Sequence, residues 1–578
     1  MDSIKSFKGY GKVDELEERA FKRKTRKRLI ILIISSVVLV AVIIGAVAGT
    51  LIHKSKSESN SVPASPVSPA TSIKAVCSVT QYPDSCVSSI SSLDTSNTTD
   101  PEELFRLSLR VAIAELSKLS SLPRQLSAKS NDAQLKKALG VCETVFEDAI
   151  DRLNNSISSM EVREGEKLLS ASKIDDIKTW LSATITDQET CLDALEELNS
   201  TLLNEVKTAM QNSTVFASNS LAIVAKLIGI LHDLDIQVHR KLLSFSNSDQ
   251  FPDWVGAGER RLLQETKPTP DVTVAKDGTG DYVTIKEAVA MVPKKSEKRF
   301  VIYVKEGNYS ENIILDKSKW NVMIYGDGKD KSIVSGNLNF IDGTPTFATA
   351  TFAAVGKGFI AKYMRFENTA GAAKHQAVAF RSGSDMSVFY QCSFDAFQDT
   401  LYAHSNRQFY RECDITGTID FIFGNAAVVF QACKIQPRQP MSNQFNTITA
   451  QGKKDPNQNT GISIQKCSIS ALNTLTAPTY LGRPWKAYST TIVMQSNIGS
   501  FLNPKGWTEW VTGVDPPSTI FYAEFQNTGP GATLDQRVKW AGFMTNITED
   551  EAAKFTVGTF IQGTSWLSES SVTFDASL

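Results

Sequence analysis

The sequence predicts a right-handed parallel β-helix in its second half, preceded by an all-α up-and-down helical bundle and by an N-terminal transmembrane signal anchor. Three observations carry this prediction. A cysteine-centred unit recurs through the second half, apolar residues follow a helical spacing in the first half, and an uncharged apolar run lies near the start. A length of 578 residues suits two or three domains, and the net charge of −1 gives no reason to expect nucleic acid as a partner.

The apolar run covers residues 29–52 and follows a strongly basic segment, residues 1–28. It is long enough to span a bilayer as a helix. Because basic flanks stay on the cytosolic side, we expect residues 1–28 to be cytosolic and the chain after the span to be translocated. A cleaved signal peptide is the alternative, but its apolar core would be shorter. Residues 53–72 are rich in serine and proline and predict an extended linker.

Residues 73–239 predict the helical bundle. Apolar residues recur three or four positions apart, as in Leu104, Leu107 and Val111, and glycine is scarce. We interpret these stripes as the core of a small bundle, and nothing in this part of the sequence points to catalysis.

Residues 240–269 predict a processing linker, because paired basic residues lie there among glycines and prolines, between two dissimilar domains. The predicted processing residues are Arg240, Lys241, Arg260 and Arg261. Asn-x-Ser/Thr sequons fit a translocated chain, although such triplets also arise by chance. The predicted glycosylation sites are Asn97, Asn154, Asn199, Asn212, Asn308 and Asn546.

Residues 270–578 predict the β-helix. Short Cys-x-Phe or Cys-x-Ile units begin at Cys392, Cys413, Cys433 and Cys467, and glycine, asparagine and β-branched residues are frequent between them. Irregular coils of about 20 to 35 residues with short strands are typical of a solenoid. A β-sandwich would show more even spacing and clear hairpin turns.

Each half of the chain holds four cysteines. No C-x-x-C pair occurs and the chain has only five histidines, so we expect neither a metal site nor a cofactor. Even counts in a translocated chain predict disulfides, and stacked coils bring consecutive cysteines close together. The predicted pairs are Cys392–Cys413 and Cys433–Cys467 in the second half, and Cys77–Cys86 and Cys142–Cys191 as the simplest pairing in the first half, where other pairings stay open.

Two aspartates occupy equivalent places in successive repeats. Asp399 lies seven residues after Cys392, and Asp420 lies seven residues after Cys413. The equal steps predict that the two carboxylates lie on neighbouring strands, about 4.8 Å apart. Two such carboxylates cannot both ionise easily, so one pKa should rise while the other stays low. A polar ladder on a solenoid is the alternative, but an acid beside a nucleophile indicates an enzyme.

Other side chains favour that second interpretation. Gln376 and Gln398 can donate amide hydrogens, and Arg483 can hold a carboxylate ionised through two hydrogen bonds. Apolar residues directly after Asp420 reduce its contact with water. His375 and His404 flank the motifs, but a serine esterase is disfavoured because the chain has no G-x-S-x-G segment.

From about residue 271 to residue 574, the second half resembles plant pectin methylesterases. The matching segments, in order, are GNYSE at 307–311, QAVAF at 376–380, QDTL at 398–401, DFIFG at 420–424 and LGRPW at 481–485. Phe380 stands where many relatives carry leucine. The first half resembles, more loosely, the pectin methylesterase inhibitor domain that precedes the enzyme in many of these proteins, including its four cysteines.

This resemblance implies hydrolysis of the C6 methyl esters of homogalacturonan to pectate and methanol. Asp420 would be the nucleophile, and Asp399 would be the acid and then the base. Gln376 and Gln398 would stabilise the oxyanion, and Arg483 would hold Asp420 ionised. The implied substrate-binding residues are Thr346, Gln376, Arg483 and Trp485.

The resemblance also implies a place of action and partners. The protein would be secreted to the cell wall (apoplast) from a precursor that is membrane-anchored in the secretory pathway. Its partners would be methyl-esterified homogalacturonan, a processing protease and inhibitor proteins related to its own helical domain, and it would be a monomer after processing.

Two alternatives to an esterase fit these residues less well. A glycosidase on the same polymer would also use paired carboxylates, but the glutamines and Arg483 suit an oxyanion and a carboxylate nucleophile better. A lyase is disfavoured because the calcium-binding aspartate cluster that it needs is not apparent in the sequence. A non-enzymatic wall-binding protein is disfavoured because Asp399 and Asp420 are both intact.

Overall fold

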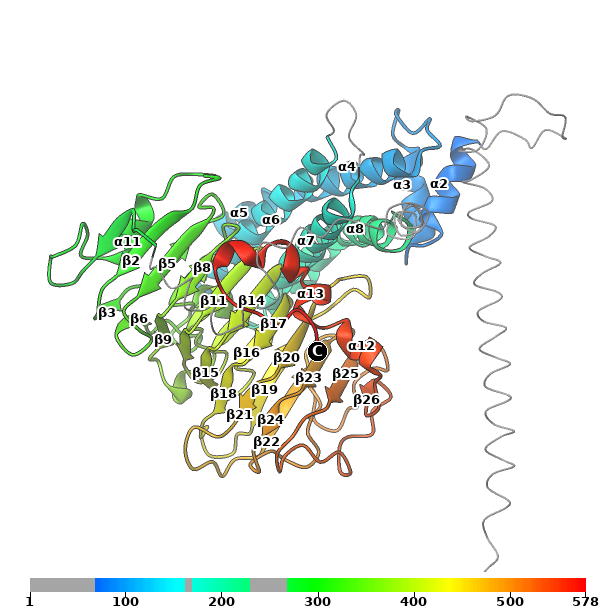
Figure 1. Ribbon diagram of the computed structural model, residues 1–578. Coiled ribbons are helices and arrows are strands. Elements are labelled where there is room, and N and C mark those ends of the chain that lie inside the picture. The colour runs from blue at the N-terminus through cyan, green and yellow to red at the C-terminus, as the bar shows by residue number, and fades with distance from the viewer. Residues whose placement is uncertain (1–67, 162–168, 229–267) are drawn as a thin grey trace, which may run out of the picture.

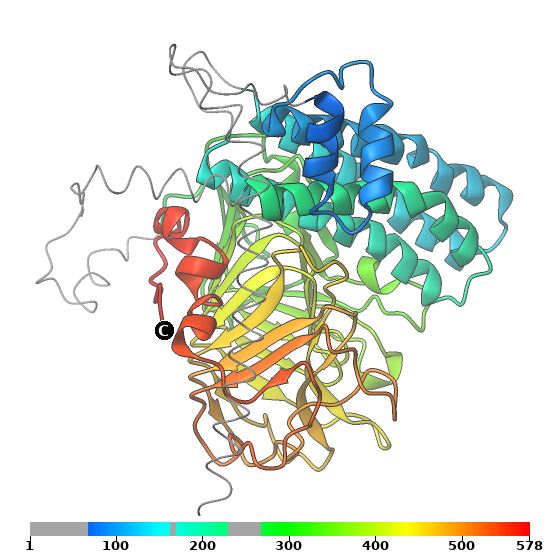
Figure 2. The same cartoon turned by 90° about the vertical axis from the view of Figure 1, so that its right-hand side faces the viewer.

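The computed structural model describes residues 68–161, 169–228 and 268–578. The predicted anchor at 29–52, the basic segment before it and nearly all of the linker at 53–72 lie outside these ranges, as do all four predicted processing residues. Among the residues that the structure describes, no helix combines the length and the apolar character needed to cross a membrane. In Figures 1 and 2 the helices of the first half lie against one side of an elongated stack of strands.

The first half is helical, as predicted. α4 packs against α6 and α8, and α7 packs against the same two helices, which gives a four-helix arrangement. The apolar face of this arrangement is buried, with Leu104 and Leu107 fully inaccessible to solvent. The helices are α2 (Pro69–Cys77), α3 (Pro83–Ser91), α4 (Pro101–Leu119), α5 (Leu122–Lys129), α6 (Ala133–Ser159), α7 (Ala171–Glu196), α8 (Leu203–Ala222) and the π-helix η1 (Ile223–Ile228).

The helical part begins earlier than the sequence pattern indicates. α2 starts at Pro69, inside the segment predicted as linker, because Ser68 caps it by accepting a hydrogen bond from the backbone N–H of Thr71. Proline at the first helical position has its backbone angle already suited to a helix and has no N–H that needs a partner. The side chains of Asp100, Asp132 and Ser170 cap α4, α6 and α7 in the same way, and Asp132 accepts from two backbone N–H groups.

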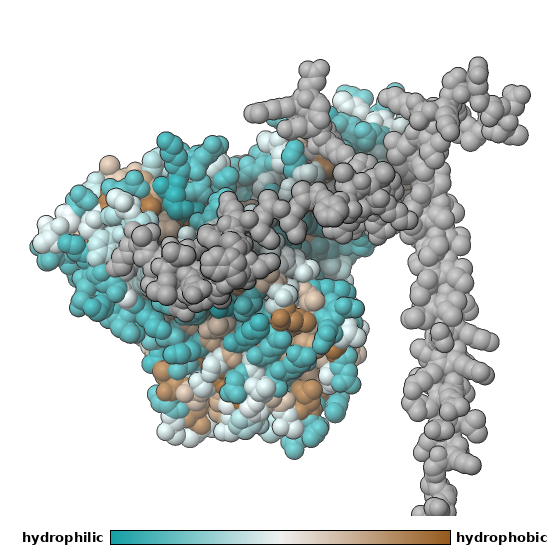
Figure 3. All heavy atoms as spheres, viewed as in Figure 1, coloured by the Kyte–Doolittle hydropathy of each residue, from teal (hydrophilic) through white to brown (hydrophobic). Residues whose placement is uncertain are grey.

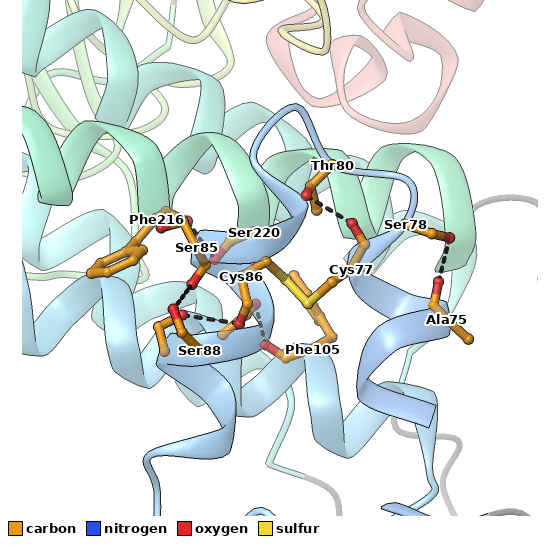
Figure 4. The surroundings of a disulfide bond; sticks show 12 residues. Ala75, Cys77, Ser78, Thr80, Ser85, Cys86, Ser88, Phe105, Phe216 and Ser220 are labelled. Atoms are coloured by element: carbon orange, nitrogen blue, oxygen red, sulfur yellow. Dashed lines mark hydrogen bonds between the residues drawn. A yellow bond between two sulfur atoms is a disulfide. The ribbon is translucent and has the colours of Figure 1, made fainter. Parts of the chain in front are cut away.

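Two disulfides lie in the helical part, and both are the predicted ones. Cys77–Cys86 joins the end of α2 to α3, with Phe105 of α4 nearby (Figure 4). Cys142–Cys191 joins α6 to α7. The second bond closes a long loop, because its cysteines are separated by 49 positions in the sequence, and so it removes considerable freedom from the unfolded chain.

The second half is a parallel β-helix of three sheets, in which all strand pairs are parallel. The eleven-stranded sheet contains β1 (Val272–Val274), β2 (Phe300–Val304), β5 (Val322–Gly326), β8 (Ile360–Lys362), β11 (Ser387–Tyr390), β14 (Arg407–Arg411), β17 (Ala427–Gln431), β20 (Gly461–Gln465), β23 (Thr490–Met494), β25 (Phe521–Phe525) and β26 (Phe543–Met544). The eight-stranded sheet contains β3 (Gly307–Ser310), β6 (Ser332–Gly336), β9 (Arg365–Asn368), β12 (Ser393–Asp395), β15 (Asp414–Gly417), β18 (Lys434–Pro437), β21 (Ser468–Ile469) and β24 (Asn497–Ile498).

The remaining sheet, called here the groove sheet, faces the helical part. It contains β4 (Ile313–Leu315), β7 (Phe352–Ala354), β10 (Phe380–Ser382), β13 (Leu401–Ala403), β16 (Ile422–Gly424), β19 (Asn446–Gln451) and β22 (Thr479–Pro484). Short helices complete the domain: α11 (Ile285–Ala290), α12 (Glu549–Ala553) and α13 (Val557–Phe560), and the 3-10 turns η2 (Thr346–Ala348), η3 (Ala372–Lys374), η4 (Gly563–Ser565) and η5 (Leu567–Ser570).

The recurring cysteine unit marks one corner of each coil, where the chain passes from the eleven-stranded to the eight-stranded sheet. The residue before each cysteine has a positive φ: 50° at Gln391, 54° at Glu412, 54° at Ala432 and 54° at Lys466. This left-handed conformation turns the chain sharply between two short strands. The apolar residue two places after each cysteine points inward, and these residues stack in register along the eight-stranded sheet.

The predicted disulfides Cys392–Cys413 and Cys433–Cys467 are wrong, since all four residues are buried free thiols. Equivalent positions of stacked coils are separated by one strand spacing of about 4.8 Å with their side chains parallel, whereas the Cβ atoms of a disulfide lie about 3.8 Å apart. The thiols donate hydrogen bonds to backbone carbonyl groups instead, as from Cys413 to Phe389.

The outer surfaces of two sheets are covered. The C-terminal turns, with Trp566 and Leu567, pack on the eleven-stranded sheet. The bundle packs on the groove sheet, where one continuous apolar cluster joins helical residues to Phe347, Tyr402 and Phe423. The side of the molecule drawn in Figure 3 carries mostly hydrophilic residues on its described surface, with apolar residues in scattered positions.

Candidate active site

Asp420 is held by two neighbours on the groove sheet. Arg483 donates from Nε to Oδ1 at 2.9 Å and from Nη2 to Oδ2 at 2.6 Å. The hydroxyl of Thr447 donates to Oδ1 at 2.6 Å. Charge-assisted hydrogen bonds of this kind stabilise the ionised carboxylate and fix its orientation. Asp420 is therefore an oriented, buried carboxylate, with 5% of its surface exposed.

Asp399 is also buried, and its carboxyl group accepts no such hydrogen bond from the part of the chain that the structure describes. Burial, and after it the charges of Asp420 and Glu197, raise the pKa of Asp399 well above its usual range, against the opposing effect of Arg483. The surroundings of Asp399 therefore favour its protonated form, while the carboxylate of Asp420 is bound to Arg483. The two carboxyl groups thus have different surroundings, and their roles as acid and nucleophile stay a prediction.

Both aspartates occupy strained backbone positions. The φ angle is 64° at Asp399 and 49° at Asp420, and each residue lies two positions before a strand of the groove sheet. Aspartate tolerates the left-handed region better than most residues, but the conformation still costs free energy. Close contacts in the chain support this geometry: a Cβ atom at Gly424 would clash with the carbonyl oxygen of Ala403.

Gln376 and Gln398 join the two aspartates in one cavity of about 430 Å³, together with Arg483. The backbone brings the glutamines to adjacent coils, because the N–H of Ala377 donates to the carbonyl of Gln398 at 3.2 Å. The structure thus brings all five predicted catalytic residues together. The side-chain amides of Gln376 and Gln398 are groups in this cavity that can donate hydrogen bonds to an oxyanion beside Asp420.

Aromatic rings line the same cavity. Tyr402 and Phe423 stack with ring centroids 4.2 Å apart, and Trp485 stacks on Trp510 at 6.1 Å. The guanidinium carbon of Arg483 lies 4.2 Å from the ring centre of Trp510. Trp485 therefore lies in the groove, as expected of a residue that contacts a sugar.

Other residues line the groove but were not predicted from the sequence. Thr447 lies in no recognised motif, and only the fold brings it to Asp420, 27 positions earlier. The ring of Trp510 comes from a loop with no strand pattern. Tyr402 and Phe423 could have been found by alternation, because each stands between two inward-facing residues of a strand.

Thr346 lies at the groove edge, where it meets the helical part. Its backbone N–H donates to Oε2 of Glu197 at 3.1 Å. Burial raises the pKa of this glutamate to about 7, although the hydrogen bonds from Thr346 act in the opposite direction. The end of α7 thus inserts a carboxyl group into the cavity of the two aspartates.

More contacts fix α7 over the groove. Lys486, which follows Trp485, binds Asp193 at 2.6 Å and Glu189 at 2.8 Å. Nε2 of His404 lies 2.9 Å from the hydroxyl of Thr190. His404 is thus a buried interface residue, and burial lowers its pKa well below the usual value.

All six predicted glycosylation sites are exposed to solvent. Asn308 in strand β3 is among them, so packing against a neighbouring coil does not bury it. The geometry is therefore compatible with glycosylation at each of them.

Two family models match the chain: Pectinesterase at residues 271–564 and Plant invertase/pectin methylesterase inhibitor at residues 71–223. Pectinesterase 3 of Phaseolus vulgaris is 64% identical over 100% of both chains, and Pectinesterase 1 of Arabidopsis thaliana is 61% identical over 98% of both. The solved pectin methylesterase from carrot is 52% identical, with a TM-score of 0.52, and matches 54% of this chain and 99% of its own. The chain therefore belongs to the pectinesterase family, esterases that hydrolyse the methyl esters of pectin, and carries an inhibitor-like helical domain in front of the esterase.

Proposed function

We propose that Asp420 is the nucleophile of this pectin methylesterase and that Asp399 is its acid and base. The observation that carries this assignment is the pair of hydrogen bonds from Arg483 to Asp420, beside a carboxyl group, Asp399, whose pKa is raised by burial. A free carboxylate next to a proton donor is what acyl transfer from a methyl ester requires.

In the first step, an oxygen of Asp420 attacks the C6 carbonyl carbon of a methyl-esterified galacturonate. The negative charge that develops on the carbonyl oxygen is stabilised by the amide hydrogens of Gln376 and Gln398. The bond to the methoxy oxygen then breaks, Asp399 gives its proton to that oxygen, and methanol leaves. Asp420 is left in a mixed anhydride with the sugar.

In the second step, Asp399 is the base. It takes a proton from water, and the resulting hydroxide attacks the anhydride carbonyl carbon. The bond between C6 and Asp420 breaks, which regenerates the carboxylate of Asp420, leaves Asp399 protonated and releases the sugar as galacturonic acid, which gives its proton to the solvent. No cofactor enters either step. Trp485 and Thr346 are proposed to hold the sugars on either side, Trp485 by contact with a ring face and Thr346 through the backbone N–H that Glu197 now occupies.

The uncut chain is proposed to be an autoinhibited precursor. Supporting this, α7 lines the catalytic cavity through Thr190, Asp193 and Glu197, so that a polymer cannot enter while the helix is docked. Processing at the basic pairs at 240–241 and 260–261 would separate the two parts. Separate inhibitor proteins related to the helical domain would dock in the same way.

The remaining proposals concern the route of the protein. A signal anchor at 29–52 would hold the precursor in the secretory pathway, and processing would release a monomeric enzyme to the cell wall. The disulfides of the helical part fit an oxidising compartment, as does the exposure of the sequons.

The test is methanol release from highly methylated pectin by residues 268–578, beside the Asp420→Ala variant. Methanol from the parent and none from the folded variant would support the assignment. Equal release by both would overturn it, and a shortened polymer without methanol would indicate a glycosidase or lyase.

A further inference from the structure

A second cavity, of about 470 Å³, lies between α6 and the first coils of the β-helix. Phe347 lines both this cavity and the catalytic one, so the two are neighbours on the same surface. On the enzyme side, the second cavity is lined by two cationic residues, Arg381 and Lys317. Neither takes part in the proposed reaction.

Arg381 lies on the floor of the groove. In the register of the groove sheet it stands between Ala353 and Tyr402, and the same row continues through Phe423. Its guanidinium carbon lies 3.6 Å from the ring centre of Phe347, and its Nε donates to the carbonyl of that residue at 3.1 Å. The side chain is thus fixed in place.

The rest of the guanidinium group of Arg381 is not used by an ion pair. Among the residues described by the structure, no carboxylate lies within ion-pair distance of it. The titratable groups that act on its charge are Tyr402 of the groove sheet and, from the helical part, Asp148, Asp187 and Arg152. Although burial lowers the pKa of Arg381 to about 10, it stays protonated at neutral pH.

Lys317 is surrounded by carboxylates of the helical part. Its ammonium group lies 2.8 Å from Asp151, 3.6 Å from Asp148 and 3.8 Å from Glu147, all on α6. Residues three and four positions apart on a helix lie on one face, so α6 presents a row of carboxylates to the enzyme. A galacturonan without methyl esters also presents a row of carboxylates, one on each sugar.

We propose that Lys317 and Arg381 form a subsite for the free carboxylates of de-esterified galacturonan, and that the acidic face of α6 occupies this subsite in the uncut chain. The inference rests on the proposed function, because that reaction produces such carboxylates in the adjacent groove. Each turnover replaces a neutral ester by an anion, and only the anion gains an ion pair here. The subsite therefore favours chains that are already partly de-esterified.

The experiment measures binding to residues 268–578, a unit that the carrot protein supports as independent, because 99% of that solved chain matches only 54% of this one. The probes are an unesterified oligogalacturonate and its fully methyl-esterified counterpart, titrated calorimetrically at low ionic strength. We expect Lys317→Gln to raise the Kd of the unesterified probe about tenfold and to change that of the ester little. Arg381→Gln should act in the same direction, and Arg381→Lys, which keeps the charge, should bind better than Arg381→Gln.

The matched control is Lys434→Gln, which removes an exposed positive charge from the eight-stranded sheet. It should leave both dissociation constants at the parental values. An unchanged Kd for the unesterified probe in folded Lys317→Gln, or an equal rise in the control, would overturn the subsite. Lys317 is 37% exposed, so this variant decides the matter even where substitution of the buried Arg381 prevents folding.

Binding and catalysis can fail separately in this design. A parent that releases no methanol but binds the unesterified probe through Lys317 would overturn the esterase mechanism and leave the subsite standing. A parent that releases methanol but binds the probe without help from Lys317 would overturn the subsite alone.

Discussion

The carboxyl group of Glu197 accepts a hydrogen bond from the backbone N–H of Thr346, 149 positions further along the chain, inside the cavity that holds Asp399 and Asp420. One residue of the helical part thus occupies a polar contact of the catalytic groove. Its charge also adds to the forces that raise the pKa of Asp399. The inhibitor-like part therefore covers the groove and changes the protonation of the groove residues.

This contact makes inhibition by the uncut chain dependent on pH. Burial raises the pKa of Glu197 to about 7 in the docked state, whereas an undocked glutamate has a pKa of about 4.3. As the pH rises from the lower value to the higher one, undocking releases a proton, so docking weakens. Asp193, with a pKa raised to about 6 by burial despite Lys486, acts in the same direction.

The expected result is stronger inhibition at acidic pH than above neutrality. The measurement is the ratio of methanol release by the uncut and the cut chain, because this ratio cancels the pH dependence of the enzyme itself. In Glu197→Gln, which cannot ionise, the ratio should change less with pH. An uncut chain with a ratio that is constant from about pH 4 to pH 8 would contradict this account.

Proton donation by Asp399 should affect kcat most when the leaving alcohol is a poor leaving group. We expect Asp399→Asn to lower kcat on the methyl ester by about 10²–10⁴-fold, because methoxide leaves poorly without a proton. The loss should be much smaller on a trifluoroethyl ester of the same polymer, whose alcohol is more acidic. Release of the two alcohols can be followed side by side.

Asp420→Asn provides the contrast, because loss of the nucleophile should abolish release of both alcohols. An equal loss on the two esters in Asp399→Asn would argue against a role for Asp399 as proton donor.

Thr447 should contribute to catalysis through Asp420. Thr447→Val removes the hydroxyl that donates to Oδ1 at 2.6 Å, and we expect kcat/KM to fall about tenfold. Thr490→Val is the matched control, since its hydroxyl donates to the backbone carbonyl of Tyr488 and not to a catalytic group. Equal losses in the two variants would show that the effect is general and does not pass through Asp420.

The thiol content should distinguish the two halves of the protein. The structure has two disulfides in the helical part and four free thiols in the β-helix. The denatured protein should therefore react with four equivalents of a thiol reagent before reduction and eight after it. Four reactive thiols at first, all mapped to the second half, would support this assignment, and none would restore the pairs expected from the sequence.

Loss of a disulfide should destabilise the helical part and leave the β-helix unaffected. Removing Cys142–Cys191 by a double serine substitution should lower the stability of the helical part by about 4 kcal/mol, given the length of the loop that it closes. The melting temperature of the β-helix part should not change. Separate calorimetric transitions of the cut protein would show both effects.

Patterns in the sequence predicted the β-helix, the helical part and the five residues that are proposed to be catalytic. Periodic spacing carries this information, because residues one coil apart must stack and residues three or four apart in a helix must share a face. The equal spacing of Asp399 and Asp420 from their preceding cysteines was enough to predict that the two carboxylates are neighbours. The cysteine steps obeyed the same rule, but there it misled: stacking brings side chains near one another, while a disulfide needs a closer and differently directed approach.

The elements that cover the groove are evident from the folded chain and not from its sequence patterns. The contact of Glu197 with Thr346 and the carboxylates of α6 around Lys317 join parts of the chain with no common repeat or spacing. No sequence motif predicts the hydrogen bond from Thr447 to Asp420 either. Such contacts depend on how two separately folded surfaces meet, and local sequence patterns record the folding of each surface but not the docking of one on the other.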